Sequence, residues 1–156
     1  LDPRTLAKML DAVDVTDSEL VLDVGAGYGY SAAIIAYLAE AVVALESEDR
    51  PANEMQNALI ENGIDNVIVE QGPLLDGAAS HAPYDVIFVQ GGVEFIPEQI
   101  ISQLKEGGRM VALFMEGTLG TVKIGYKVKG GLNWRFAFNA GAPVLSDFEK
   151  EKTFIL

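Results

Sequence analysis

The sequence contains no cysteine, a single histidine and few basic residues: 11 lysines and arginines stand against 23 acidic residues. Without cysteine there can be no disulfide and no thiolate-bound metal. His81 lacks the partner spacing of metal ligands, so we interpret it as a surface loop residue and expect no metal site. The net charge of −12 at pH 7 disfavours nucleic acid and acidic membranes as partners, because both call for a basic surface.

The sequence also lacks an apolar run of the roughly 18 to 20 residues that span a bilayer, and no signal peptide opens it. A reducing compartment suits a chain without cysteine, so we expect a cytoplasmic protein. The 156 residues are 49% hydrophobic and 22% charged, which is typical of one globular domain, predicted over residues 1–156. Because the first residue is Leu1 and not methionine, we expect an upstream segment to precede it.

The most informative stretch is residues 21–30, with the sequence VLDVGAGYGY. Its apolar part, which carries one acid, is typical of a strand buried on both faces. The alternating glycines allow a sharp turn and the close approach of a ligand, because they have no Cβ. A helix is expected to follow, with free N–H groups in its first turn. The pattern predicts a strand, a nucleotide-binding turn and a helix.

The glycine spacing and the acid indicate which ligand the turn binds. A dinucleotide fingerprint, G-x-G-x-x-G, would need glycine where Tyr30 stands, whereas the third glycine here is Gly29. Asp23, at the end of the strand, would repel a pyrophosphate but attract a ligand with a positive end. S-adenosylmethionine carries an ammonium and a sulfonium and no phosphate, so we prefer it to a nicotinamide cofactor. A tight turn without a ligand is the alternative.

Strands and helices alternate through most of the chain, which implies parallel strands with right-handed crossovers. Apolar runs predict strands at 20–24, 41–45, 67–69, 84–89 and 110–114. Helical spacing predicts helices that begin at Pro3, after the glycine turn, at Pro51 and at Pro97, the last ending at Gly107-Gly108. Further strands at 122–129 and 132–138, joined by a turn at Gly130-Gly131, predict an antiparallel hairpin at the edge of the sheet.

Two other positions follow strands on the side where open α/β sheets bind ligands. Glu46 ends the second strand about 20 residues after the first glycine, where an acid often binds ribose hydroxyls; a strand end in solvent is the alternative. Residues 90–92, Gln-Gly-Gly, follow the fourth strand, and we expect the substrate mouth there. Asp85 opens that strand and is interpreted as a surface residue, not a base.

With these pieces, the sequence resembles the seven-stranded, S-adenosylmethionine-dependent methyltransferases, and more narrowly the protein-L-isoaspartate (D-aspartate) O-methyltransferase family. The similarity covers nearly the whole chain and rests on the blocks 21–33, 81–89 and 96–111, the last with a Leu-Lys-x-Gly-Gly-Arg turn. The resemblance implies an α/β fold: a Rossmann-like three-layer sandwich whose seven-stranded sheet is mostly parallel, with an antiparallel C-terminal hairpin.

The resemblance also implies a cofactor site for S-adenosylmethionine. Its predicted residues are Asp23, Gly25, Ala26, Gly27, Tyr28, Gly29, Glu46 and Gln90. The family usually carries a Gly-Asp pair after the third strand, whose acid meets the adenine. Here Gly72 is followed by Pro73, which offers no carboxylate and no N–H, so Gln71 or Asp76 would have to substitute.

Two further departures concern the methyl acceptor. The family's Thr-Ala-Ala after the fourth strand is replaced by Gln-Gly-Gly at 90–92, and its serine near the acceptor corresponds to Leu1. A leucine cannot hydrogen-bond a carboxylate. No catalytic residue is assigned, because a carboxylate acceptor is ionised at neutral pH and needs no general base.

The expected function is therefore carboxyl methylation of isoaspartyl residues in a protein or peptide, a protein-repair reaction. The alternative is a divergent homologue that has lost this repair and acts on another acceptor or serves as a binding module. A nicotinamide enzyme is a third possibility. The oligomeric state is left open.

Overall fold

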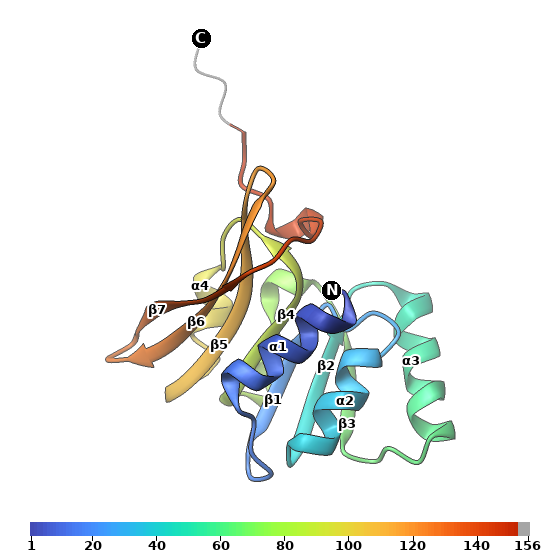
Figure 1. Cartoon of the computed structure of the whole chain (residues 1–156). Helices are drawn as coiled ribbons and strands as arrows, with labels where there is room; N and C mark the ends of the chain where they lie inside the picture. The colour runs from blue at the N-terminus through green and yellow to red at the C-terminus, as the bar shows by residue number, and fades with distance from the viewer. Residues whose placement is uncertain (153–156) are drawn as a thin grey trace.

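A computed structural model describes residues 1–152, so the last four positions of the predicted domain, 153–156, lie outside the described residues. Seven strands form one sheet in the order β3-β2-β1-β4-β5-β6-β7 (Figure 1). The strands are β1 (Leu20–Val24), β2 (Ala41–Glu46), β3 (Val67–Gln71), β4 (Tyr84–Val93), β5 (Leu104–Glu116), β6 (Leu119–Val128) and β7 (Gly131–Asn139). The helices are α1 (Pro3–Val13), α2 (Tyr30–Leu38), α3 (Asp49–Glu61) and α4 (Glu98–Ile101), with short 3-10 helices η1 (Leu74–Asp76), η2 (Ala79–His81) and η3 (Ser146–Phe148).

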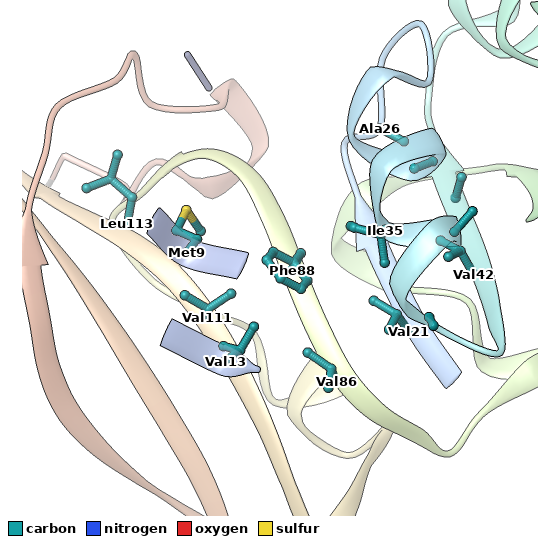
Figure 2. Packing of buried hydrophobic residues seen from close by; sticks show 14 of the residues in the cluster. Met9, Val13, Val21, Ala26, Ile35, Val42, Val86, Phe88, Val111 and Leu113 are labelled. Carbon is teal, nitrogen blue, oxygen red and sulfur yellow. The ribbon is translucent and has the colours of Figure 1, made fainter. Parts of the chain in front are cut away.

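The sheet is covered on both faces, which gives the three layers that were predicted. Helices α1, α2 and α3 lie on one face, and α4 lies on the other (Figure 1). Side chains of β4 alternate between the faces: Phe88 joins the core under the long helices, and Ile87 joins the core on the other side. Figure 2 shows Phe88 between residues of α1 and residues of α2. The second face is covered more thinly, by η1, α4 and η3.

Helix α1 is fixed at both ends. The Asp2 side chain accepts a hydrogen bond from the Thr5 N–H at 2.9 Å and caps the helix, and Pro3 occupies its first turn. At the other end, Arg109 of β5 donates to the Val13 carbonyl and pairs with Glu19 at 2.8 Å. These contacts hold α1 across the sheet, so that its start lies over the carboxyl end of β1.

The parallel strands confirm the predicted crossovers. β1 pairs in parallel with β2 and with β4, and β2 pairs in parallel with β3. The antiparallel edge is confirmed as well, because β6 runs against both β5 and β7. The turn between β6 and β7 lies one residue earlier than predicted. Lys129 and Gly130 both have positive φ, 52° and 79°, the geometry of a two-residue hairpin turn.

Most strands are longer than the sequence predicted, β4 and β5 by the most, and the helix between these two strands is shorter. β4 continues through Gly91 and Gly92 to Val93, and β5 begins at Leu104, so only Glu98–Ile101 remains helical between them. Pairing explains the change: Leu104 lies opposite Tyr84, whose N–H donates to the Gln103 carbonyl at 2.8 Å. No helix among residues 1–152 is long and apolar enough to cross a membrane.

Candidate active site

The glycine turn joins β1 to α2 in a conformation that other residues adopt only with strain. Gly25, Gly27 and Gly29 all have positive φ, at 78°, 58° and 94°. At Gly29 a Cβ would also lie 2.6 Å from Met55 Cγ of α3, so this glycine lets two helices approach closely. At Gly27 a Cβ would meet nothing within 4 Å. The turn is therefore packed against Met55 of α3 at Gly29, and it faces open space at Gly27.

The end of β2 holds this turn in place. The N–H groups of Gly25 and Ala26 both donate to the Leu45 carbonyl, at 2.9 and 3.0 Å. The Gly27 N–H donates to Glu46 Oε1 at 3.1 Å, and the Glu48 N–H donates to Glu46 Oε2 at 2.9 Å. The Ser47 hydroxyl also donates to Oε2, at 3.4 Å. Glu46 is buried, but Oε1 has a second lone-pair site that can accept a hydroxyl.

Asp23 lies beneath the turn and is completely buried. Its Oδ2 accepts from the Ser31 hydroxyl of α2 at 2.5 Å, and its Oδ1 accepts from Gln90 Nε2 of β4 at 2.7 Å. Burial raises the pKa of Asp23 from 3.8 to about 6, and the hydrogen bonds from Ser31 and Gln90 oppose that rise. The carboxylate thus joins β1, α2 and β4, and it faces the space above the turn only through its partners.

A hollow of about 340 Å³ lies above the turn. Five of the predicted cofactor residues border it: Gly25, Ala26, Gly27, Tyr28 and Gln90. The other three lie around it, with Asp23 below, Gly29 at the start of α2 and Glu46 at the neighbouring strand end. The structure therefore gathers the predicted set at one place.

Four further residues, outside the predicted cofactor set, also border the hollow: Leu1, Leu6, Tyr30 and Ser31. Of these, Leu1 was placed near the methyl acceptor by the family resemblance. Tyr28 and Tyr30 are 58% and 62% exposed, so they stand at the rim and do not fill it. The sequence carried a signal for Ser31, a hydroxyl in the first turn of the helix that follows the glycines. For Leu6 it carried none beyond helical spacing, because its position depends on where α1 crosses the sheet.

The place of the hollow matches a general rule of open α/β sheets. Going outward from β1, the chain order runs to β2 and β3 on one side and to β4 and β5 on the other. Ligands bind at such a switch point, beyond the carboxyl ends of the two central strands. Gly25 directly follows β1, and Gln90 lies near the end of β4. Both border the hollow, so the hollow lies where the topology favours a ligand.

Gln71 and Asp76, the proposed substitutes for the family's Gly-Asp pair on the adenine side, differ in whether their side chains are already hydrogen-bonded. The amide of Gln71 donates to Asp49 at the start of α3. Asp76 is exposed, and its carboxylate accepts no hydrogen bond within the described residues. Pro73 precedes η1, whose Leu74 is buried in the core. Of the two candidates, only Asp76 offers a carboxylate, and that carboxylate is free to bind a ligand.

The Gln-Gly-Gly segment has a structural explanation. The chain after β7 returns along β4: the Gly92 N–H donates to the Pro143 carbonyl, and the Leu145 N–H donates to the Gly92 carbonyl, both at 2.9 Å. A Cβ at Gly91 would lie 2.6 Å from Leu145 Cγ. We call residues 142–145 the C-terminal strap. The two glycines make room for it, so residues 90–92, which were predicted to follow the fourth strand, are part of that strand.

Comparison with known proteins identifies the family that the chain resembles. The sequence profile of the family described as "Protein-L-isoaspartate(D-aspartate) O-methyltransferase (PCMT)" matches residues 2–124. "Protein-L-isoaspartate O-methyltransferase 2" from Polaromonas sp. is 42% identical over 109 residues, which are 70% of this chain and 52% of that protein. "Protein-L-isoaspartate O-methyltransferase" from Syntrophus aciditrophicus is 38% identical over 109 residues, again 70% of this chain and 50% of the relative.

Solved structures give the same picture. A protein-L-isoaspartate O-methyltransferase superposes with a TM-score of 0.85 and 27% identity, over 92% of this chain and 47% of that one. A putative protein-L-isoaspartate O-methyltransferase from Plasmodium falciparum, in complex with S-adenosyl-L-homocysteine, shares the fold with a TM-score of 0.77 and 19% identity, over 92% of this chain and 74% of its own. The chain spans about half the length of the curated relatives it matches. It belongs to the protein-L-isoaspartate (D-aspartate) O-methyltransferase family.

Proposed function

We propose that this chain is an S-adenosylmethionine-dependent methyltransferase that methylates the carboxyl group of isoaspartyl residues in proteins or peptides. The observation that carries the proposal is the open turn at Gly27, at the carboxyl ends of β1 and β4, with the Asp23–Gln90 pair beside it. The names of the relatives supply the acceptor class.

The residues of the site fit this cofactor. The turn, which is open at Gly27, accommodates the close approach of a ligand. The Gln90 amide, which is held by Asp23, borders the space for the positive amino-acid end, and Glu46 Oε1 has an acceptor site left for a ribose hydroxyl. No phosphate would find a basic side chain here, since every residue that borders the hollow has a neutral side chain. When bound, S-adenosylmethionine supplies an electrophilic methyl group on a sulfonium.

The chain's own task is to hold the cofactor and the acceptor carboxylate in position and to shield them from water. An isoaspartyl carboxylate is ionised at neutral pH and can attack without a base, so positioning and the exclusion of water supply the rate. Leu1 and Leu6 of the α1 region give the hollow an apolar wall. Asp85 takes no part, because it lies at the start of β4, accepts from the Leu20 N–H at 2.9 Å and pairs with Lys105 at 3.1 Å.

The physiological role that goes with this activity is the repair of damaged proteins. We propose that it takes place in the cytoplasm, a compartment compatible with a chain that has no cysteine. No nucleic acid or membrane partner is proposed, given the net charge of −12.

The test is a methyl-transfer assay with labelled S-adenosylmethionine, an isoaspartyl peptide and the matched aspartyl peptide. We expect label to enter only the isoaspartyl peptide. Gly27→Ala should reduce cofactor affinity at least about tenfold, because its methyl group enters the open turn. Gly63→Ala is the control, since Gly63 also has positive φ (67°) and open space around it but lies at the end of α3. Equal losses in both variants would mean that backbone strain, not the site, is responsible.

A second candidate function rests on the residues at the acceptor side. Leu1 borders the hollow where the family has a serine, and the C-terminal strap lies against Gly91 and Gly92. These features favour a divergent homologue with another acceptor, or a binding module. Micromolar cofactor binding without isoaspartyl turnover would support it, whereas thermal stabilisation by NAD and not by S-adenosylmethionine would indicate a nicotinamide protein.

A further inference from the structure

We propose that Gln90, through its side-chain oxygen Oε1, is the group that binds the ammonium of the cofactor's amino-acid end, and that Asp23 acts on this end only through Gln90. The inference rests on the proposed function, because it assumes that S-adenosylmethionine or its product occupies the hollow. It reverses the simpler expectation from the sequence, in which the acid itself binds the ammonium.

Burial separates Asp23 from the hollow. Its side chain has no exposed surface, and both carboxylate oxygens already accept hydrogen bonds, from Ser31 at 2.5 Å and from Gln90 at 2.7 Å. Asp23 is also absent from the residues that border the hollow, whereas Ser31 and Gln90 are among them. A ligand in the hollow therefore meets the partners of the acid, and the acid is behind them.

The hydrogen bond to Asp23 fixes which end of the Gln90 amide is free. A carboxylate can only accept, so Gln90 must present its NH2 group to it, and the orientation of the amide follows. The carbonyl oxygen Oε1 then remains, and it accepts no hydrogen bond from any of the described residues. Gln90 is half-buried at the border of the hollow. A carbonyl oxygen is an acceptor, which suits an ammonium donor.

The acid strengthens this acceptor. A hydrogen bond from an amide N–H to a nearby negative charge polarises the amide and increases the partial negative charge on its oxygen. Asp23 thus supplies the negative charge that polarises the amide, and Gln90 makes the direct contact with the ammonium. Ser31, the other partner of Asp23, is a positioning residue that holds the carboxylate from the opposite side.

The experiment compares two nucleosides that differ at the amino-acid end. S-adenosylhomocysteine carries the ammonium, and 5′-methylthioadenosine lacks the whole amino-acid end. Calorimetric titration of the full chain with each ligand gives their affinities for the wild type, Gln90→Met and Ser31→Ala. Gln99→Met, on the exposed surface of α4, controls for the introduction of a methionine.

We expect Gln90→Met to lower the affinity for S-adenosylhomocysteine about tenfold or more, the loss of one hydrogen bond to a charged group, and to leave the affinity for methylthioadenosine within about twofold. Ser31→Ala should cost less than Gln90→Met, because Gln90 remains in place. If Gln90→Met does not fold, Gln90→Asn keeps an amide but is too short to bridge, and the same selective loss is expected.

Two results would overturn the inference while the proposed function survives. One is an equal loss of affinity for both nucleosides in Gln90→Met, which would place Gln90 away from the amino-acid end. The other is a loss in Ser31→Ala as large and as selective as in Gln90→Met, which would mean that Asp23 binds the ammonium and Gln90 only holds the acid. A wild type that binds neither nucleoside would refute the proposed function and this inference together.

Discussion

The two halves of the sheet are built differently. β1, β2 and β3 are five or six residues long, run in parallel and are joined through helices, whereas β5, β6 and β7 have 13, 10 and 9 residues and follow one another through tight turns. Every residue of β1 after Leu20 is buried, and none of β7 is. Parallel strands bring their carboxyl ends to one edge, and the glycine turn, Glu46 and Gln90 meet there. The antiparallel half cannot gather side chains in this way.

The reversed direction of a single strand nevertheless connects the halves. Because β6 alone runs against the others, β7 ends at the same edge as β1 and β4. The chain after β7 can therefore return along β4, where the C-terminal strap pairs with Gly92. The antiparallel half thus contributes one segment, the C-terminal strap, to the edge of the sheet that carries the site.

The largest predicted effect compares a buried phenylalanine of the central strand β4 with an exposed phenylalanine of the antiparallel half. Phe88 of β4 has no exposed surface and lies between α1 and α2 (Figure 2), whereas Phe136 of β7 is 64% exposed. We expect Phe88→Ala to lower the free energy of unfolding by about 4 kcal/mol, through lost burial and a cavity. Phe136→Ala should lower it by less than about 1 kcal/mol. Urea titration measures both, and similar losses would show that the outer half is as well packed as the inner.

The parallel half was the easier to predict from the sequence. Buried parallel strands read as continuous apolar runs, so residues 20–24 and 41–45 were placed within a residue of β1 and β2. The glycine turn was predicted because its spacing is local. In the outer half, the bounds of β5 depend on pairing with β4, and those of α4 depend on β5. Such long-range contacts leave little trace in local periodicity, which explains the helix predicted from Pro97 to Gly107.

The same distinction applies to the site. The residues that border the hollow were largely predicted, since they lie in one stretch and at one strand end. The contacts that engage Asp23 were not, because Ser31 lies 8 residues away and Gln90 lies 67 residues away along the chain. The approach of Leu145 to Gly91 spans the two halves and has no sequence pattern of its own.

The second prediction concerns the buried acid in the parallel half. The pKa of Asp23 is about 6 in the folded chain against 3.8 ordinarily, so between these values the folded state binds the extra proton. Stability from this group therefore falls as pH rises through the window, and it is constant above it. The wild type loses this stability as the pH rises, and Asp23→Asn, which cannot titrate here, does not. The unfolding free energy of Asp23→Asn minus that of the wild type should therefore increase by about 2 kcal/mol between about pH 4.5 and about pH 7.

Denaturant titrations at several pH values measure that difference directly, and taking the difference removes the titration of other groups common to both proteins. Asp147 of η3, which is exposed, provides a control: Asp147→Asn should follow the wild type across the same range. A difference between Asp23→Asn and wild type that does not change with pH would mean that Asp23 is ionised throughout and better solvated than its burial indicates.

The smallest predicted effect tests the link between the halves. Gly91→Ala places a methyl group 2.6 Å from Leu145 Cγ, so we expect it to lower the unfolding free energy by about 1 to 2 kcal/mol. Leu145→Ala removes the obstacle, and Gly91→Ala in that background should cost about 1 kcal/mol less. Gly141→Ala, beside the strap with nothing within 4 Å of its Cβ, should show no coupling to Leu145→Ala. If the losses of unfolding free energy are coupled at Gly91 and not at Gly141, the strap packs tightly against β4 beside the site. If the losses at Gly91 and Leu145 are additive, the two segments are adjacent but do not constrain each other.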